Sequence, residues 1–536
     1  MTRRHDGKGF DAVVIGSGMG GLSAAVLLGR LHGKRVLVLE RHYRAGGYTH
    51  TFTRKGGYRW DVGVHYVGNM QPGSGERDLV DVVTGAEVQW SPMPDVFERL
   101  VYPDFEVGVR KGREGFRDDL AAMFPAEAAA IDQYFADVER ARSYMGVIGA
   151  RGAAPAPVGA LLDLLSPRAR KLALATTGAH LATLFRDARL RSIVGARWGD
   201  YGEPPETSAF LAHAVIHDHY FNGGFYPVGS SARLAETAAR ALEATGGELR
   251  VHAEVRRVLI EKGRAVGVEL TDGEQVRAPV VISDAGARNT YLRLVPDDVP
   301  LPFRDELRAT APSRRFVTLF LGLDSSPRAL GANGENLWIH RFHDQDEMAR
   351  RSAETLDGRP PLALVCFPSL KDPTARAHTG EIIAPVDATA FEAWSGTRWM
   401  KRGAEYESLK HRIAEGMLDL AERRLPGLRA MVRHRELSTP LSAEHFTSHF
   451  RGESYGVPVT PERFQKDYLR VRTPVAGLYL TGADALMLGV VGAMRAGQAC
   501  ASAIAGPAAM LKIASEARRV RAAQRATREE PVPSSA

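Results

Sequence analysis

The chain has 536 residues, with 70 Lys and Arg against 63 Asp and Glu and a formal net charge of +7. Because one hydrophobic core stops growing at about 250–300 residues, this length predicts at least two domains. A content of 44% apolar and 25% charged residues excludes a disordered, collagen-like or coiled-coil chain. The two cysteines, Cys366 and Cys500, exclude a disulfide framework and suit a reducing compartment. A net charge of +7 spread over 536 residues does not favour a nucleic-acid partner, and we expect none.

The first elements in chain order are a strand, a glycine-rich turn, a helix and a second strand. Asp11–Ile15 is a short apolar run typical of a buried parallel strand. Leu22–Leu31 is rich in helix formers, and Gly33 stands where a helix C-terminal cap belongs. Val36–Leu39 predicts a second buried strand, which ends at an acidic residue.

Gly16, Gly18 and Gly21 lie between the first strand and the helix, at the spacing of a dinucleotide-binding turn. Gly16 allows the tight turn, Gly18 lets the backbone approach a pyrophosphate, and Gly21 lets the helix pack closely on the strand. Glu40 could accept hydrogen bonds from both ribose hydroxyls and would repel a 2′-phosphate. With both strands and the helix in place, the pattern predicts a dinucleotide site rather than a glycine turn of an unrelated fold.

The N-terminus and the longest apolar stretch both argue against targeting or membrane-spanning segments. Met1–Gly9 is polar and charged, unlike a secretory signal. Val475–Met494 is the nearest approach to a spanning segment, but Asp484 and four glycines interrupt it. We therefore expect a cytoplasmic protein that could lie peripherally on a membrane.

Two other segments bear on membrane contact. Ala154–Phe185 is leucine-rich and is interrupted by Pro167–Lys171. It is equally consistent with an amphipathic, membrane-grazing entrance for a lipid substrate and with an ordinary helical cap. Lys512–Arg528 is strongly basic, which predicts a solvated helix end that fades into disorder at Pro531–Pro533, with contact to an anionic membrane as the alternative.

The middle of the chain predicts a second, β-rich unit. Ala404–Arg424 has apolar residues at helical spacing and precedes Pro426, which stops the helix. Glu248–Ile260 and Arg264–Leu270 are predicted as paired strands. Three turn-separated runs predict an antiparallel sheet, namely Arg315–Leu323, Asn336–Phe342 and Pro361–Phe367.

The C-terminal part repeats the strand-to-helix pattern. Gly477–Thr481 predicts a strand, and Ala493–Ala505 predicts a small-residue helix ended by Gly506-Pro507. Asp484 lies between them and, taken alone, would be a helix-capping or turn aspartate.

Taken together, these segments resemble the FAD-binding fold of the amine oxidase and carotenoid desaturase superfamily. Gly46-Gly47 after the ribose-binding acid matches its extended FAD fingerprint. Leu478–Asp484 with Gly489–Gly492 matches its second flavin motif. Gly46–Phe52 and Trp60–Gly68 are most similar to the retinol saturase and carotenoid isomerase branch. Further similarity lies in Tyr226–Gly229, Val281–Ala285, Thr439–Leu441 and Glu444–Thr447.

The resemblance implies an α/β fold with a discontinuous Rossmann-like FAD-binding domain and an α+β substrate domain carrying an antiparallel sheet and a helical cap. The FAD domain would comprise residues 1–75, 220–290 and 435–510, and the substrate domain residues 76–219 and 291–434, followed by the basic tail 511–536. The implied cofactor is non-covalent FAD. Its expected contacts are Gly16, Gly18, Met19, Gly20, Gly21, Glu40, Arg41, Gly46, Gly47, Thr49, His50, Thr51, Val255, Gly482, Asp484, Val491 and Gly492.

The electron partner and the oligomeric state stay open at this level. No second strand, G-x-G-x-x-G turn and helix is visible, and Gly331–Gly334 has the wrong spacing for one. A dedicated NAD(P) domain is therefore not expected. NAD(P)H could bind transiently over the flavin, or another donor or acceptor could serve.

Candidate proton donors are Tyr66 first, then His65 and Tyr220, placed in an apolar substrate pocket. The alternative makes all three hydrogen-bonded packing residues. His217 and His219 lack a partner at ligand spacing, so no metal is expected. His50, near Gly47, is expected to tune the flavin.

The leading hypothesis is an FAD-dependent oxidoreductase that saturates or desaturates a C=C bond of an apolar isoprenoid, retinoid or carotenoid-like substrate by hydride transfer at flavin N5. One alternative is a redox-neutral polyene cis–trans isomerase that uses reduced FAD. Another, from a different class, is a non-enzymatic prenyl-lipid-binding protein similar to the prenyl-GTPase escort proteins. The escort proteins lack a working flavin site, whereas this chain keeps the glycines and acids of one.

Overall fold

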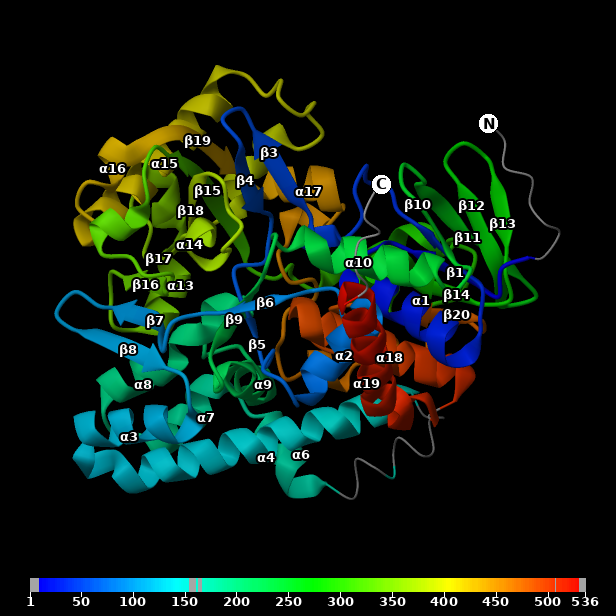
Figure 1. Ribbon diagram of the computed structural model, residues 1–536, viewed down its shortest axis with the longest axis horizontal. Helices are drawn as coiled ribbons and strands as arrows, with labels where there is room; N and C mark the ends of the chain where they lie inside the picture. Colours follow the sequence, from blue (N-terminus) through cyan, green and yellow to red (C-terminus); the bar gives the residue numbers. More distant parts are fainter. Residues whose placement is uncertain (1–8, 154–160, 162–165, 507, 530–536) are drawn as a thin grey trace.

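A parallel sheet forms the centre of one half of the protein (Figure 1). The computed structural model describes residues 9–153, 161, 166–506 and 508–529. All neighbouring strands of this sheet run parallel. In spatial order they are β10 (Glu248–Arg250), β2 (Val36–Leu39), β1 (Ala12–Ile15), β14 (Val281–Ser283) and β20 (Leu478–Leu480).

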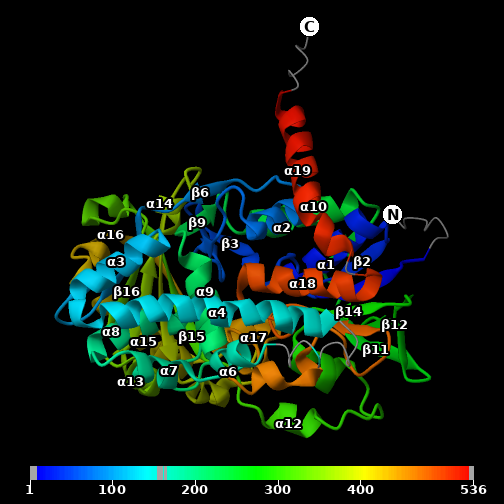
Figure 2. The same cartoon turned by 90° about the horizontal axis from the view of Figure 1, so that it is seen from below.

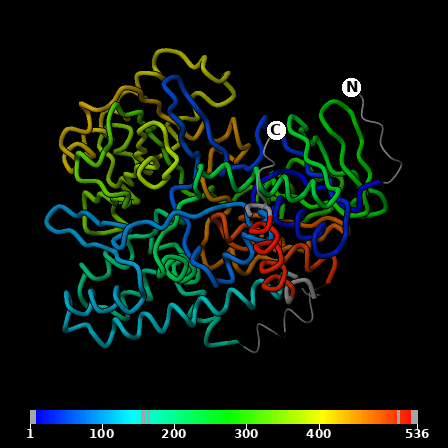
Figure 3. Tube along the Cα trace, viewed as in Figure 1, coloured from blue at the N-terminus to red at the C-terminus, as the bar shows by residue number. Residues whose placement is uncertain are grey.

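Strands that are far apart in the sequence build this sheet. Figure 3 shows the blue N-terminal trace, the green middle segment and the orange C-terminal segment lying together on the right. Helix α1 (Met19–His32) starts directly after the glycine turn and ends at Gly33, which has a φ of 61°. It packs against α18 (Gly489–Ala505), which starts four residues earlier than the sequence predicts.

One predicted strand is in fact two. Glu248–Arg250 pairs with β2 in the parallel sheet, whereas β11 (Val255–Glu261) pairs with β12 (Arg264–Leu270) in a separate antiparallel sheet completed by β13 (Gln275–Arg277). The prediction of a continuous strand over Glu248–Ile260 is therefore wrong. The chain leaves the first sheet at residues 251–254, where His252 has a φ of 54°.

A seven-stranded sheet forms the other half, at the upper left of Figure 1. Neighbouring strands are antiparallel except β16 and β7, which run parallel. Its order is β19 (Val432–Ser438), β15 (Arg315–Leu323), β18 (His378–Val386), β17 (Leu362–Cys366), β16 (Asn336–His340), β7 (Val96–Val101) and β8 (Glu106–Arg110). Helix α15 (Ala404–Arg424) covers part of it and has the predicted bounds.

Small strand pairs and long helices join the two halves. β3 (Thr51–Arg54) pairs with β4 (Tyr58–Asp61), and β9 (Gly224–Pro227) lies between β5 (Val67–Gly68) and β6 (Trp90–Pro92). The long helix α4 (Ala128–Ala153) runs beside α9 (Phe210–Tyr220) in Figures 1 and 2. The mixed α/β architecture confirms the predicted fold class, while the exact domain boundaries stay a prediction.

The two candidate membrane segments are described only in part. Residues 154–160 and 162–165 of the leucine-rich segment lie outside the described residues, and α6 (Pro167–Ala173) and α7 (Thr177–Leu184) follow them. The basic tail forms α19 (Ala508–Glu529), which projects from the body in Figure 2; Pro531–Pro533 lie outside the described residues. Arg521 joins α19 to α2 (Gly75–Thr84) through Asp78 and Asp81. No helix among the described residues is long and apolar enough to cross a bilayer.

Candidate active site

A cavity of about 1330 Å³ lies where the parallel sheet meets the seven-stranded sheet. The glycine turn after β1 lines one side of it. Apolar side chains of the seven-stranded sheet line another, namely Phe316, Phe320, Leu362, Leu364 and Ile383. The cavity therefore joins a dinucleotide-type turn to an apolar floor.

The glycine turn has no room for side chains. Gly16 has a φ of 93°, in the left-handed region that favours glycine. A Cβ on Gly20 would stand 2.6 Å from the backbone of Gly482, and one on Gly21 would stand 2.5 Å from the carbonyl oxygen of Gly16. The turn thus brings backbone and the N-terminus of α1 to the cavity, an arrangement that suits a pyrophosphate.

Glu40 is held at the cavity wall by neighbouring hydrogen bonds. Its Oε2 accepts from the backbone N–H of Ser17 at 2.9 Å and from the Ser17 hydroxyl at 2.6 Å, and its Oε1 accepts from the N–H of His42 at 2.7 Å. A carboxylate oxygen has two lone pairs, so the group keeps acceptor capacity toward the cavity. This geometry fits a ribose with two free hydroxyls.

Asp284, directly after β14, is an acid of this site that sequence reasoning did not single out, although its segment belongs to the family resemblance. A Cβ added to Gly18 would stand 2.4 Å from Asp284 Oδ2. The Oδ2 atom is buried and has no hydrogen-bond partner among the described residues. Burial raises the pKa of Asp284 to about 7, and the charge of Glu40 acts in the same direction. The backbone N–H groups of Gly21 and Gly18 oppose this shift, because they stabilise the charged form. A carboxyl that stays protonated near neutrality could donate to a phosphate oxygen, so this orphaned atom fits a bound pyrophosphate.

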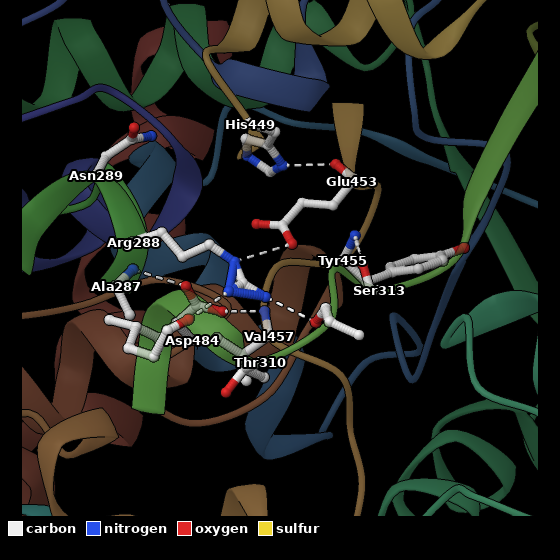
Figure 4. Close-up of polar contacts among 12 residues, drawn as sticks. Ala287, Arg288, Asn289, Thr310, Ser313, His449, Glu453, Tyr455, Val457 and Asp484 are labelled. Atoms are coloured by element: carbon white, nitrogen blue, oxygen red, sulfur yellow. Dashed lines mark hydrogen bonds and ion pairs between the residues drawn. The ribbon is translucent and has the colours of Figure 1, made fainter. Parts of the chain in front are cut away.

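Asp484 joins two loops at the cavity, as Figure 4 shows. Its Oδ2 accepts from the N–H of Ala287 at 2.7 Å, and its Oδ1 accepts from the N–H of Val457 at 2.8 Å. The N-cap of α18 is Leu488, so Asp484 does not cap the helix that follows it; it lies in the turn before that helix, as the turn alternative states. The carboxylate instead orders two backbone segments around the second flavin motif.

A buried ion pair stands beside Asp484 in Figure 4 and was missed by the sequence reasoning. Arg288 Nε lies 3.4 Å from Glu453 Oε2, and both residues line the cavity. Burial raises the pKa of Glu453 to about 8, although the positive charge of Arg288 opposes the shift. His449 donates its Nδ1–H to the carbonyl oxygen of Glu453 at 2.9 Å. No local motif marks these residues, because they come from different segments.

Most of the expected cofactor contacts lie on this cavity. Gly21, Thr51, Val491 and Gly492 are not among its lining residues; Gly21 packs α1 on β1, and Gly489, Val490 and Ala493 of α18 line the cavity instead. The expected contacts that do line it are Gly16, Gly18, Met19, Gly20, Glu40, Arg41, Gly46, Gly47, Thr49, His50, Val255, Gly482 and Asp484.

Of the three candidate proton donors, only His65 lines the cavity. Its Nδ1 lies 2.9 Å from Glu381 Oε2 and 3.9 Å from the sulfur of Cys366. Burial alone would lower the pKa of His65, but the hydrogen bonds to Cys366 and Glu381 outweigh it and raise the pKa to about 10. His65 is therefore a cation at neutral pH.

The same three side chains have the spacing of metal ligands, with all ligand atoms within 4.8 Å of one another. Lys371 lies close by and donates to the carbonyl oxygen of His65 at 2.8 Å. Because this ammonium adds positive charge beside the group, we interpret the cluster as an ion pair with a thiol rather than a metal centre. His217 contacts the hydroxyl of Tyr134 at 3.2 Å, as a packing residue would.

Tyr66 and Tyr220 lie behind the cavity wall instead of lining it. Their rings stack with centroids 4.2 Å apart. The hydroxyl of Tyr66 is enclosed by Glu98 and Asp200, and burial raises the pKa of both phenols. Placing them in the substrate pocket is therefore not supported, because their hydroxyls are engaged inside the protein; the packing alternative describes both better.

The fold and the turn agree with known flavoproteins. Residues 14–80 match the model of the NAD(P)-binding Rossmann-like domain family. A structure of putrescine oxidase bound to putrescine superposes with a TM-score of 0.61 over 93% of this chain and 100% of that chain, at 18% identity. The protein thus has the fold of the amine oxidase class of flavin-dependent oxidoreductases.

The sequence comparison goes further. All-trans-retinol 13,14-reductase of Danio rerio is 32% identical over 538 residues, covering 95% of this chain and 88% of the relative. Phytoene desaturase (neurosporene-forming) of Cereibacter sphaeroides is 28% identical over 88% of this chain and 90% of the relative. The chain belongs to the family of FAD-dependent oxidoreductases that includes all-trans-retinol 13,14-reductase and the carotenoid desaturases. The relatives are oxidoreductases that act on C=C bonds, so the alternative of a non-enzymatic, escort-like binding protein is not supported.

Proposed function

We propose that the protein reduces a C=C bond of an apolar retinoid- or carotenoid-like substrate, with reduced FAD as the working form of the cofactor. The relationship to 13,14-reductases carries this proposal. The apolar floor formed by residues such as Phe316, Phe320 and Leu364 supports it, since an unactivated alkene offers only apolar surface for binding. The protein must then accelerate the reaction by aligning the alkene with the cofactor, not by polarising the double bond.

The residues of the cavity fit FAD. We propose that the α1 N-terminus receives the pyrophosphate beside Asp284, that Glu40 binds the ribose and that Val255 lies against the adenine. Asp484 and its two loops would hold the flavin half, with the N-terminus of α18 directed at it. When bound, the cofactor supplies hydride transfer at N5. His65 would contribute a fixed positive charge to the cavity wall.

The test starts with the absorption spectrum of pure protein, followed by anaerobic mixing of the dithionite-reduced form with a panel of polyenes. We expect bound flavin, released intact by heat because the attachment is non-covalent, and reoxidation by a retinoid or carotenoid with loss of one double bond. Isomerisation of the polyene without net electron consumption would instead establish the redox-neutral alternative. Colourless protein that takes up no FAD would refute both.

For the electron donor we propose a reduced nicotinamide that binds transiently over the flavin, since the sequence has no second strand, G-x-G-x-x-G turn and helix to form a separate nicotinamide site. Anaerobic mixing of the oxidised protein with NADH or NADPH tests this proposal. Bleaching of the flavin would support it, and a flavin that only dithionite reduces would point to a protein donor.

Glu40→Ala is expected to weaken FAD binding roughly tenfold or more. Charge-assisted hydrogen bonds from two ribose hydroxyls should contribute about 1.5–3 kcal/mol. Titration of apoprotein with FAD measures this, and Glu87→Ala serves as the control because Glu87 pairs with Arg240 away from the cavity. Unchanged affinity in Glu40→Ala would refute the ribose assignment.

We further propose that the cavity mouth rests on an anionic membrane. Tyr43, Trp399 and Met400 line the cavity, yet are 49%, 37% and 76% exposed; we refer to them as the mouth patch. Arg398 and Lys401 flank Trp399 and Met400 and are exposed as well. Exposed apolar tips between cations suit an anionic lipid surface, and an apolar substrate could enter the cavity from it.

Trp399→Ser/Met400→Ser is expected to weaken binding to phosphatidylserine-containing vesicles about tenfold or more. Burying a large apolar side chain contributes about 1.5–3 kcal/mol, and the double change removes two. Sedimentation with vesicles measures it. Met123→Ser is the matched control, because Met123 is 45% exposed on α3 (Arg113–Met123), away from the cavity. Equal losses in both variants would contradict a specific mouth patch.

A further inference from the structure

Tyr66 lies between two carboxyl groups, and this arrangement indicates that one of the carboxyls is protonated. Its hydroxyl oxygen is 2.5 Å from Glu98 Oε1 and 2.8 Å from Asp200 Oδ2. A phenol has one proton and can donate one such hydrogen bond. Two carboxylates on either side of one hydroxyl would repel each other, so the arrangement indicates that one of the two carboxyls carries a proton.

Glu98 is the one that carries the negative charge. Its Oε2 lies 2.5 Å from Arg197, and Oε1 also accepts from the indole N–H of Trp338 at 3.3 Å. The Glu98 side chain is fully buried, so it keeps its charge only through these partners. Asp200 is farther from the same cation, with 3.9 Å between its Oδ2 and Arg197 Nη1. The proton therefore belongs on Asp200, and because Oδ2 accepts from the Tyr66 hydroxyl, it belongs on Oδ1.

The electrostatic surroundings of Asp200 agree with a proton on this carboxyl. Burial, reinforced by the charge of Glu98, raises the pKa of Asp200 to about 7, although Arg197 and His65 oppose the shift. The charged and titratable groups that face Asp200 from the elements around it are Glu98, Arg197, His65, Tyr66, Tyr201, Tyr220 and Tyr455.

Asp200 also faces the substrate side. It ends η3 (Ala196–Asp200) and lines the cavity with Gly199 and His65, and its side chain keeps 12% of its surface exposed. Its Oδ1 takes part in no hydrogen bond or ion pair among the described residues. Oδ2 is thus held by the Tyr66 hydroxyl, while Oδ1 can carry the proton toward a molecule bound in the cavity.

We propose that Asp200 is the acid that protonates the substrate alkene, with Tyr66 and Glu98 as positioning residues behind it. This inference rests on the proposed function. Reduced FAD, when bound, would supply the hydride for one alkene carbon and would itself be oxidised as the C=C bond is reduced. The O–H bond at Oδ1 of Asp200 would break as a C–H bond forms at the other carbon. Solvent then returns a proton to the carboxylate, and a two-electron donor such as a reduced nicotinamide restores the cofactor.

Asp200 suits this role better than His65. A general acid works best when its pKa lies near the working pH, because it is then both protonated and able to release the proton. His65, with a pKa of about 10 and an anionic partner in Glu381, holds its proton too firmly. It serves instead as the fixed cation across from the acid.

The first test is single-turnover reoxidation of dithionite-reduced protein by the alkene that the polyene panel identifies. Asp200→Asn should slow it at least about 100-fold with little change in substrate affinity. The wild-type rate should fall as pH rises through about 7, since only protonated Asp200 is active. Glu203→Gln is the control, because Glu203 is a buried carboxyl outside the cavity, and it should keep the wild-type rate.

The second test needs no substrate. The infrared spectrum of wild-type protein minus that of Asp200→Asn should show a protonated-carboxyl C=O band at pH 6 that disappears with a midpoint near 7. Tyr66→Phe removes the hydrogen bond to Asp200 while nearly conserving volume. A positioning role predicts that this variant keeps the band but shifts its midpoint, together with the pH profile of reoxidation. A merely structural role would move neither.

The outcomes separate this inference from the proposed function. If wild-type protein reduces no polyene but the infrared band is present, the function fails and the protonated Asp200 stands as a structural finding without a reaction. If wild-type protein reduces the alkene and Asp200→Asn does so at the same rate, the acid lies elsewhere. Absence of the band at pH 6 overturns the proton assignment whatever the activity.

Discussion

Arg197→Met is expected to lower the free energy of unfolding by about 3–5 kcal/mol, because it leaves Glu98 as a buried, uncompensated charge. The side chains of Arg197 and Glu98 are 7% and 0% exposed, and the guanidinium also lies over the rings of Phe97 and Tyr220. Urea denaturation followed by tryptophan fluorescence measures the change.

An exposed ion pair provides the control. Arg350 pairs with Glu206 at the surface, with side chains 60% and 66% exposed, so Arg350→Met should cost at most about 1 kcal/mol. Replacing both members of the buried pair, as Glu98→Leu/Arg197→Met, should recover part of the loss, since no lone charge remains. Equal destabilisation by Arg197→Met and Arg350→Met would contradict the account.

Gly497→Val is expected to destabilise the cofactor-binding half by about 3 kcal/mol or more and to abolish FAD retention. A Cβ at Gly497 of α18 would stand 2.4 Å from the carbonyl oxygen of Gly20 and 2.8 Å from the backbone nitrogen of Ala24, both in α1. Backbone atoms cannot move aside as a flexible side chain can, so the helices must separate and disturb the glycine turn. Thermal unfolding and FAD content report the two effects.

Gly146→Val is the control for this substitution. Gly146 is an exposed residue of α4, and a Cβ there meets nothing within 4 Å. Its stability should change by no more than about 0.5 kcal/mol. Retention of FAD by Gly497→Val would show that α1 and α18 can part without disturbing the site.

The parts of the site that sequence reasoning anticipated are those whose chemistry is local. Gly16, Gly18 and Glu40 lie within one strand–turn–helix–strand unit, so their spacing alone indicates what they do. The polar network behind the cavity has no such signature. Tyr66 meets Asp200 from 134 residues away, and His65 meets Glu381 from 316 residues away. Only the packed sheets bring such residues together.

The neighbours His65 and Tyr66 illustrate the difference. Both were candidates for the same role because they share one motif, yet His65 faces the cavity while the Tyr66 hydroxyl points into the protein toward Glu98. Motif resemblance indicated the right segment, but not which side chain reaches the substrate. The residue that the geometry favours, Asp200, belongs to a segment in which no motif was visible.

The strand order of the parallel sheet also governs how the protein can be made. β1 and β2 leave the ribosome first, but β14 is complete only at Ser283 and β20 only at Leu480. Before α18 is synthesised, the face of α1 that packs against Gly497 is exposed, and the sheet lacks β20, one of its edge strands. The nascent chain must therefore carry an apolar helix and an open sheet edge through most of translation, which makes chaperone protection valuable and defers cofactor capture until synthesis is nearly finished.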